Sequence, residues 1–507
     1  MTRIVRKKWR ASMAAAGALT LLLTGCGARL TAAQEAALNG AAGSAGGGGA
    51  SGGQLQAAGS GGSTQAASSN TVPGLAAASG GAESGQASTS AKTGTAASSS
   101  GGGGSSGAST VAPADDPLAG PNGKLCPAGA PSSDPGVTAK TITVGNIATI
   151  NGPVPGLFAG ARYGAEAVAA YINSMGGLCG RQLVVDSADD QFDQATDQNE
   201  ASSMASQVLA FMGSFSLQDA GIPAGAPNVP DIGEALSSQR FDSPMNFSPS
   251  PEAPGYQTSA YQWFIQSPVY HEATQHMALL VENTPQTAQT GTWEESALQS
   301  VGFKFIFVDK TLQPTDPTFN GDVQKMKAAG VQGVIFQATG QITGQLANAM
   351  YQAGMKIVLG NYSPAAYDPA YLQNAGPGAA GTILSQSMAL YDGQDANQVP
   401  MVATLDQWYA RVDPGQVPDV YAVYSWLAGL LLAQAINTTG APTRANIVAG
   451  IKQIGQFNGD GLVAPGDPAT KTPPTCFVLI DVKNGQFVRD PATPTGFKCS
   501  PAGYYHA

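Results

Sequence analysis

The chain is poor in charge and in the residues that enzymes and metal sites use most. Charged residues make up 11% of its 507 residues, and it has three histidines and five cysteines. No cysteine pair has C-x-x-C spacing, and no phosphate-loop, dinucleotide-binding or hydrolase motif follows a predicted strand. His271 and His276 are five residues apart, whereas zinc-binding helices place two histidines four apart. We therefore expect no enzyme activity, no bound metal and no cofactor.

After its first ten residues the sequence also lacks a basic cluster. It has 24 basic and 34 acidic residues and a formal net charge of −10. An acidic chain without a basic stripe is poorly suited to nucleic acid. We expect the acidic side chains to cover a solvated exterior and no nucleic acid to bind.

The N-terminus has the pattern of an export signal. Five basic residues, Arg3, Arg6, Lys7, Lys8 and Arg10, precede the short apolar stretch 14–23. This stretch is too short for a comfortable membrane span, which takes about 20 apolar residues. The following Leu23-Thr24-Gly25-Cys26 resembles the lipobox of bacterial lipoproteins, which implies a lipid on Cys26 as the new N-terminus. The alternative is an ordinary signal peptide with an incidental cysteine.

Residues 27–114 are nearly all Gly, Ala, Ser, Thr and Gln. Such a segment cannot bury enough apolar surface to offset the entropy lost on ordering. It predicts a flexible tether with a root-mean-square reach of roughly 50 Å. With residues 1–26 as signal, the rest of the chain is expected at the outer face of the cell membrane, anchored through Cys26.

Four cysteines remain after Cys26, and an even number in an exported chain favours two disulfides. Of three connectivities, the sequence favours Cys126–Cys179 and Cys476–Cys499. The second pair flanks a predicted hairpin, 477–481 and 486–489, around an Asn-Gly turn. The competing interpretation, a metal site, has no suitable cysteine spacing and no nearby histidine except His506.

From residue 141 onward, short β-type runs alternate with helical patterns. This order is typical of parallel sheets with right-handed crossovers, and a Pro-rich stretch at 244–254 divides it into two series. The first series has strands at 141–147, 183–186 and 209–212 and helices at 157–175 and 193–208. The second has strands at 276–281, 303–308, 333–336 and 357–359 and helices at 292–301, 319–329 and 341–353.

Two further segments bear on packing. Residues 421–436 are apolar but short for a membrane span and contain a glutamine, so they predict a buried helix. Gly152, Gly156, Gly160 and Gly164 recur every four residues after the first strand. We expect them to form a tight loop and then a helix lying close on its sheet.

Ligands of open α/β sheets bind beyond the carboxyl ends of the strands. In the first series these ends carry 213–216 and 233–237, and in the second 337–340 and 360–363. Hydroxyls and free N–H groups there suit an anion such as a carboxylate, and the rings of Phe158 and Phe215 suit an apolar body. The alternative is that these residues only cap helices and form turns.

Residues 141 to about 248 resemble the periplasmic type I binding proteins for leucine, isoleucine and valine. The matching pieces are Ile142-Thr143-Val144-Gly145, Asn151-Gly152-Pro153-Val154, Gly160-Ala161-Arg162-Tyr163-Gly164-Ala165, Ile172-Asn173, Gly176-Gly177, Gly180-Arg181 and Asp189-Asp190. The resemblance implies an α/β fold of two lobes, each a largely parallel sheet flanked by helices. Three crossovers would join the lobes near 248–251, 385–388 and 457–462. Lobe 1 would comprise 115–250 and 387–458, and lobe 2 would comprise 251–386 and 459–507.

The same resemblance implies a ligand site. The family's donors for a ligand carboxylate fall near Ser214, Ser216, Ala235 and Ser237. Its second-lobe aromatic falls near Thr339, and its acidic partner for the ligand ammonium falls at about Tyr362. Because a phenol is neutral at neutral pH, Tyr362 offers no full charge to an ammonium, although Glu234 is a candidate substitute.

The expected function is that of a lipid-anchored, monomeric solute receptor that delivers an amino acid, carboxylate or aromatic compound to ABC permease subunits. The alternative is a membrane-tethered sensor or adhesion module of the same fold without a transport partner. An enzyme ranks third, because the sequence shows no nucleophile–base pair.

Overall fold

The computed structural model describes residues 116–152, 156–216, 218–282, 285–312, 318–338 and 340–507. Cys26, the predicted signal and all of the predicted linker lie outside these residues. So does Thr339.

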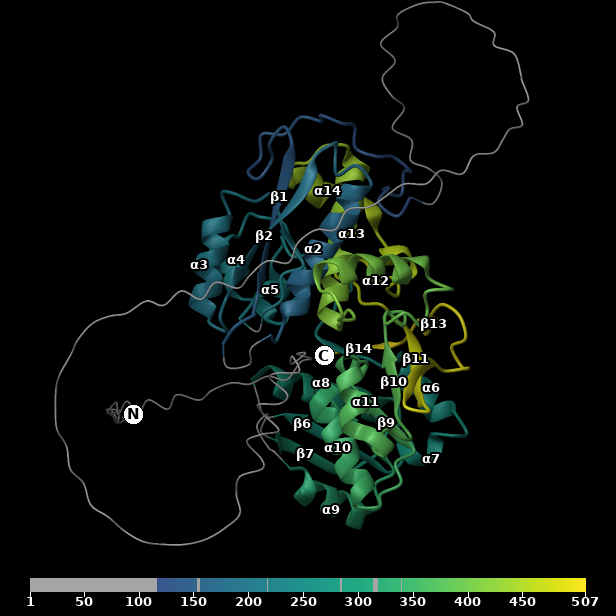
Figure 1. Ribbon diagram of the computed structural model, residues 1–507. Coiled ribbons are helices and arrows are strands. Elements are labelled where there is room, and N and C mark those ends of the chain that lie inside the picture. The colour runs from purple at the N-terminus through teal and green to yellow at the C-terminus, as the bar shows by residue number, and fades with distance from the viewer. Residues whose placement is uncertain (1–115, 153–155, 217, 283–284, 313–317, 339) are drawn as a thin grey trace, which may run out of the picture. The chain divides into compact units, whose positions relative to one another are not determined.

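The first lobe is built around a four-stranded parallel sheet with the order β2-β1-β3-β4 (Figure 1). β1 and β2 pair in continuous register from Thr141↔Gln182 to Ala148↔Asp189. The elements of this lobe are β1 (Thr141–Ala148), α2 (Ala159–Ser174), β2 (Gln182–Asp189), α3 (Gln194–Met204), β3 (Phe211–Met212), α4 (Gly221–Gly225), β4 (Asp231–Ile232), α5 (Ser238–Asp242), α12 (Pro400–Val412), α13 (Val420–Thr439) and α14 (Arg444–Ile454).

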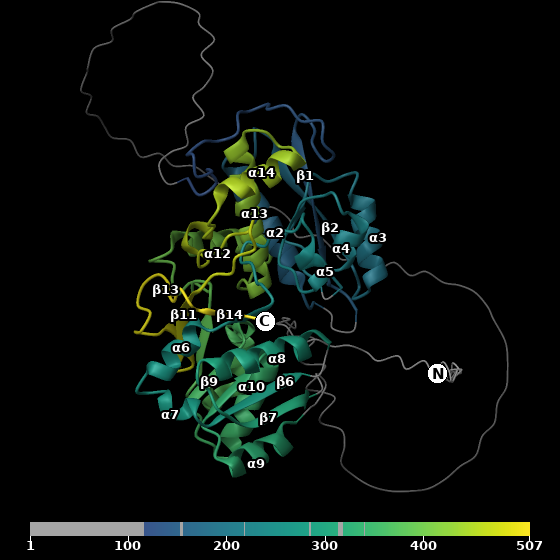
Figure 2. The ribbon, with the colours of Figure 1, turned by 180° about the vertical axis from the view of Figure 1, so that it is seen from behind.

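The second lobe contains a parallel sheet, β7-β6-β8-β9, and an antiparallel sheet, β10-β11-β12, in which β13 also pairs with β11. Figure 2 shows these elements from behind. They are β5 (Gly255–Gln257), α6 (Ser259–Gln266), α7 (His271–Thr274), β6 (Met277–Glu282), α8 (Pro285–Ser300), β7 (Phe305–Leu312), α9 (Asn320–Ala329), β8 (Gly333–Phe336), α10 (Gly340–Gln352), β9 (Leu359–Tyr362), η1 (Pro364–Ala366), α11 (Pro369–Ala375), η2 (Gly376–Ala379), β10 (Ile383–Gln386), β11 (Cys476–Lys483), β12 (Gln486–Arg489), β13 (Lys498–Cys499) and β14 (Tyr504–His506). The short helix η3 (Gly459–Gly461) lies between α14 and β11 and packs on α12 and α13 of the first lobe.

The predicted fold class, an alternation of strands and helices in two parallel sheets, is confirmed, and several boundaries are corrected. α8 begins at Pro285 rather than 292, and α3 ends at Met204 rather than 208. β9 occupies Leu359–Tyr362 rather than 357–359. The short helices α4, α5, α7 and α11 were not predicted, because a segment of four to seven residues is too short to show a helical period.

α13 is the central helix of the first lobe. Among the described residues it is the one helix long and apolar enough to cross a membrane, yet 89% of its most apolar window is buried. It packs along α2 and α14. The prediction of a buried helix at 421–436 is confirmed.

We predicted that the glycines of α2 let this helix lie close on its sheet. In the structure they face α13 instead and allow a close approach between the two helices. A Cβ on Gly164 would lie 2.3 Å from the carbonyl oxygen of Ala422, and one on Gly160 would lie 2.1 Å from the carboxylate of Asp419. From the other side, a Cβ on Gly429 of α13 would lie 2.4 Å from Val168. The two helices therefore touch through backbone.

Both predicted disulfides are present. Cys126–Cys179 ties the segment before β1 to the turn after α2, and Cys476–Cys499 joins β11 to β13. The backbone N–H of Cys126 also donates to Asn437 of α13 over 2.8 Å. The segment that precedes the first strand is thus fastened to the core of its lobe.

The chain passes between the two lobes three times. The connecting segments are 243–254, 387–399 and 455–475, here called the first, second and third crossovers. The predicted divisions after 250, 386 and 458 fall at or within them. The second and third crossovers pair, since Ala389 donates its N–H to Leu462 over 2.9 Å and Ala464 to Ser387 over 2.7 Å. The side chain of Gln257, which follows the first crossover, donates to Ser387, Pro474 and Cys476 over 3.0, 2.9 and 3.3 Å.

The contact between α2 and α13 generates a stability prediction. Gly164→Val should lower the free energy of unfolding by about 1 to 3 kcal/mol, because backbone atoms of Ala422 cannot make room for the side chain. Gly321→Val on α9 is the matched control, since nothing lies within 4 Å of a Cβ there. Urea denaturation of both variants measures the difference. Equal stabilities would show that the helices are not in close contact.

Candidate functional site

The loop after β3 carries Ser214 and Ser216, and both side chains are fully buried. The hydroxyl oxygen of Ser214 accepts the N–H of Ile147 over 3.0 Å. Ser216 donates its hydroxyl to Asp190 and accepts the N–H of Gln218 over 2.8 Å. These hydroxyls therefore bind their own lobe in this conformation, and neither is exposed at the strand end.

The loop after β4 is held by a buried carboxylate, Asp219. It accepts the N–H of Leu236 over 2.6 Å and the N–H of Ser237 over 3.1 Å. The hydroxyl of Ser237 caps α5 by accepting the N–H of Arg240 over 3.2 Å. Most of the donors predicted for a ligand carboxylate are thus engaged, while Ala235 remains half-buried at the surface of the loop.

One guanidinium joins the two loops. Arg240 is fully buried and forms two 2.8 Å hydrogen bonds with Asp231, and it lies 3.6 Å from Asp219. It also donates to the carbonyl of Ser214 over 3.2 Å. Burial opposes its charge, but the two carboxylates outweigh burial and raise the pKa of Arg240. This network could not be predicted from the sequence, because its members are scattered and none belongs to a motif.

The aromatic residues predicted to line the site pack against one another. The ring centroids of Phe158, Phe215 and Tyr421 are 4.7 to 4.8 Å apart in edge contacts. Phe158 has no exposed surface and Phe215 is 3% exposed. They form an apolar cluster at the start of α2 and α13. The loop after β3 packs on this cluster through Phe215.

Glu234 is tied to the first crossover. It is 5% exposed and accepts the hydroxyl of Ser248 over 2.5 Å. Burial raises the pKa of Glu234 well above its usual value, and the charge of Glu252 raises it further. Glu234 therefore connects the loop after β4 to the segment that leaves the lobe.

In the second lobe the structure places Tyr362 in the core. Its ring lies 5.7 Å from that of Tyr371, and its hydroxyl lies 3.1 Å from where a Cβ on Gly360 would be. The side chain therefore runs back along the strand, beneath the helices, and is 2% exposed. Burial raises the pKa of Tyr362 well above its usual value, so the phenol is neutral.

A buried polar cluster that sequence reasoning missed lies at the ends of β8 and β9. Glu294 of α8 accepts from Tyr256 over 2.5 Å and from Gln337 over 2.8 Å. Tyr256 bonds to Tyr261 over 3.1 Å, and Tyr261 donates to Asn361 over 2.9 Å. Among the described residues no partner reaches the second carboxylate oxygen of Glu294. Burial raises the pKa of Glu294 to about 7, against the hydrogen bonds from Tyr256 and Gln337.

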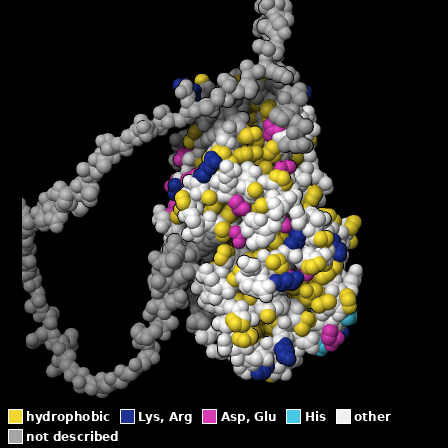
Figure 3. All heavy atoms as spheres, turned by 45° about the vertical axis from the view of Figure 1, so that its right-hand side comes forward, with side chains coloured by type: hydrophobic (Ala, Val, Ile, Leu, Met, Phe, Trp, Pro, Cys, Tyr) yellow, Lys and Arg dark blue, Asp and Glu magenta, His cyan; other side chains and the backbone are white. Residues whose placement is uncertain are grey.

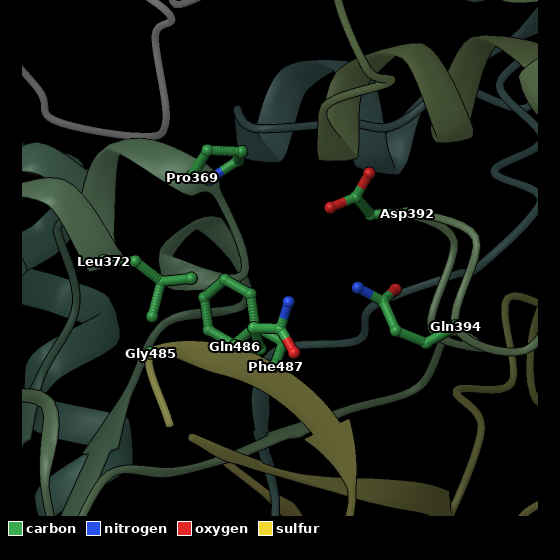
Figure 4. Close-up of a pocket in the computed structure, with 7 residues that line it drawn as sticks. All are labelled: Pro369, Leu372, Asp392, Gln394, Gly485, Gln486 and Phe487. Atoms are coloured by element: carbon green, nitrogen blue, oxygen red, sulfur yellow. The ribbon is translucent and has the colours of Figure 1, made fainter. Parts of the chain in front are cut away.

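A pocket of about 290 Å³ lies beside α11 (Figure 4). Its lining comes from α11, the second crossover and the β11–β12 hairpin, namely Pro369, Leu372, Asp392, Gln394, Gly485, Gln486 and Phe487. In Figure 4 Pro369 and Leu372 face Asp392 and Gln394 across the hollow. The adjoining crossover is fixed by the ion pair of Arg489 with Asp395, over 2.5 and 2.9 Å.

Metal-ligand geometry offers no other site in the part of the chain that the structure describes. It contains no group of three or more His, Cys, Asp or Glu side chains arranged to hold a metal ion. On the face shown in Figure 3, basic side chains are scattered among acidic and uncharged ones.

The family model described as "Periplasmic binding protein" matches residues 141–486. This match spans both lobes, and the chain therefore belongs to the periplasmic binding protein family, a family of solute-binding proteins. No curated protein sequence matches the chain significantly.

Solved structures with the same fold include three binding proteins of transporters. The fatty acid ABC transporter substrate-binding protein from Thermomonospora curvata is 19% identical, with a TM-score of 0.58 over 76% of this chain and 97% of its own. LivJ from Streptococcus pneumoniae, in complex with isoleucine, is 17% identical, with a TM-score of 0.56 over 69% and 99%. A branched chain amino acid ABC transporter structure from Thermus thermophilus, with bound valine, is 15% identical, with a TM-score of 0.58 over 71% and 97%.

The buried Glu294 generates a prediction on pH. Its pKa is about 7 in the folded protein and about 4.3 when unfolded, so the folded state keeps a proton that the unfolded chain loses in this range. Stability from this group is present below about pH 4 and is lost as the pH rises through 7, by about 4 kcal/mol in total. Glu294→Gln, which cannot ionise, should remove that loss.

Chemical denaturation at pH 4.5 and 7.5 checks this prediction. The difference in unfolding free energy between the two pH values should be smaller in Glu294→Gln than in the unsubstituted protein. An unchanged difference would mean that Glu294 ionises as it does in water.

Proposed function

We propose that this chain is the solute-binding protein of an ABC-type importer and binds a small organic ligand between its two lobes. The observation that carries the proposal is the family match, which runs through both lobes and all three crossovers. Similarity to binding proteins of fatty acid and branched-chain amino acid transporters supports the same function.

The arrangement of the strand ends supports a ligand at this place. In lobe 1, Arg240 and Asp219 hold the loops after β3 and β4 rigidly, which reduces the entropy lost when a ligand binds. In lobe 2, Gln337 is held by Glu294 and Tyr256. In each lobe, the strand ends of the parallel sheet are therefore held in position before a ligand binds. A ligand that touches both would favour the closed form, since only differential affinity shifts such an equilibrium.

The chemistry of these edges favours a ligand with a large apolar part. The related structures contain isoleucine and valine, or belong to a fatty acid transporter. Here the position expected to bind an ammonium is the neutral, buried Tyr362, and most lobe 1 donors are engaged. We therefore propose a carboxylate or neutral compound with an aliphatic or aromatic body ahead of a free α-amino acid.

Ligand screening tests the proposal. Thermal denaturation with branched-chain amino acids, medium-chain fatty acids and aromatic acids should reveal compounds that raise the melting temperature, because a ligand of the native state stabilises it. For such a compound, Ala235→Trp should weaken binding at least about tenfold, or about 1.4 kcal/mol, by filling the strand end. Ser238→Trp, at an exposed position three residues on, is the control.

Equal affinity in Ala235→Trp and Ser238→Trp, measured by calorimetry, would move the site away from the loop after β4. The pocket lined by Asp392 and Gln394 would then be the next place to test.

We further propose that the protein is anchored by lipid on Cys26 and tethered by residues 27–114. The support is the basic start, the short apolar stretch and the Leu-Thr-Gly-Cys ending. Expressed in a bacterial host, the protein should partition into detergent and show the mass of a diacylglycerol-modified N-terminus at Cys26. Cys26→Ser should be released into the soluble fraction. A membrane-bound Cys26→Ser variant would contradict the proposal.

A further inference from the structure

The end of the chain lies outside the family match. The match stops at residue 486, whereas the structure continues through β12 and β13 to a final strand, β14. Residues 500–507, here called the C-terminal strap, follow the disulfide between Cys499 and Cys476. The strap therefore lies beyond the residues that the family model matches.

The strap pairs with the strand that follows the first crossover. β14 is antiparallel to β5, with Tyr504↔Gln257 and His506↔Gly255 in register. Among the described strands, β14 is the one partner of β5. The N–H of Thr258 donates to Gly503 over 2.8 Å, and that of Ala507 donates to Pro254 over 3.1 Å.

Side chains reinforce this pairing at both ends. Tyr504 donates its hydroxyl to the carbonyl of Ala253 over 2.6 Å. At the start of α6, Ser259 donates to Gly503 over 3.1 Å. Gln262 donates to Ala502 over 3.0 Å and accepts from Ser500 over 2.7 Å. The strap thus covers the chain from the first crossover to α6.

The strand held by the strap connects to both functional parts of the molecule. Tyr256 is hydrogen-bonded to Glu294 and Gln337, at the end of β8. Its neighbour Gln257 bonds to the second crossover at Ser387 and to Pro474, at the end of the third. A shift of β5 would therefore move a strand end of lobe 2 and the joint between the lobes together.

We propose that the C-terminal strap is a built-in brace. It locks β5 against the body of lobe 2, fixes Tyr256 and Gln257, and thereby restricts the relative motion of the lobes. The disulfide Cys476–Cys499 keeps the strap at its place, because it leaves four residues, 500–503, between Cys499, which is fixed to β11, and the start of β14. The expected effect of the strap on ligand affinity rests on the proposed function. The expected restriction of β5 by the strap does not depend on it.

Hydrogen exchange tests the brace without a ligand. In a variant that ends at Ser500, the amides of 255–262 should exchange at least about tenfold faster than in the full chain, because Thr258 loses its acceptor. Exchange in β1, in lobe 1, should stay unchanged. Protection of 255–262 that survives the truncation would overturn the proposal.

A point variant covers the case in which the truncated protein fails to fold. Gly503→Val keeps the length of the chain, but a Cβ there would lie 2.0 Å from the hydroxyl of Ser259 and would push the strap off. Ala502→Val, at an exposed neighbouring position, is the matched control. Faster exchange at 255–262 in the first variant alone supports the brace, and equal exchange in both refutes it.

Calorimetry with a ligand found by screening then separates the two proposals. If the strap couples to the site, Gly503→Val should change the affinity at least about threefold relative to Ala502→Val. Altered exchange with unchanged affinity would retain the brace and refute its coupling to the site. Failure to find any ligand would bear on the proposed function and leave the exchange result intact.

Discussion

The hydrogen bonds of Gln257 meet at the point where the three crossovers come together. Its amide donates to the second crossover at Ser387 and to the carbonyls of Pro474 and Cys476. A single side chain thus links three segments that lie far apart in the sequence. Two lobes joined by three such segments can move relative to each other only as this joint permits, so any account of ligand binding depends on it.

Burial of charge is the second constraint. Arg240 lies between Asp231 and Asp219 with no exposed surface, and removing one partner would leave a buried charge uncompensated. The same ion pairs fix the loops after β3 and β4. Lobe 2 uses uncharged partners instead, since Tyr256 and Gln337 donate to the carboxyl of Glu294. The two strand edges are therefore rigid for different physical reasons.

Much of the fold was predictable, because the alternation of apolar runs and helical periods covers most of 141–359. The pairing of Cys476 with Cys499 was predictable from the hairpin between them. The direction of side chains was not. Ser214 and Tyr362 stand at strand ends in the sequence, yet one accepts a backbone N–H inside its lobe and the other runs back under the helices. Tertiary packing sets the direction of both side chains, and a pattern in the linear sequence does not show tertiary packing.

The measurement that tests solute binding between the lobes most directly is an interlobe distance. Spin labels at exposed positions 184 of β2 and 351 of α10 report on lobe 1 and lobe 2, respectively. Pulsed electron resonance with and without a saturating ligand should show the distance distribution change and become narrower when the ligand bridges both strand edges. An identical distribution in the presence of a ligand shown by calorimetry to be bound would contradict binding between the lobes.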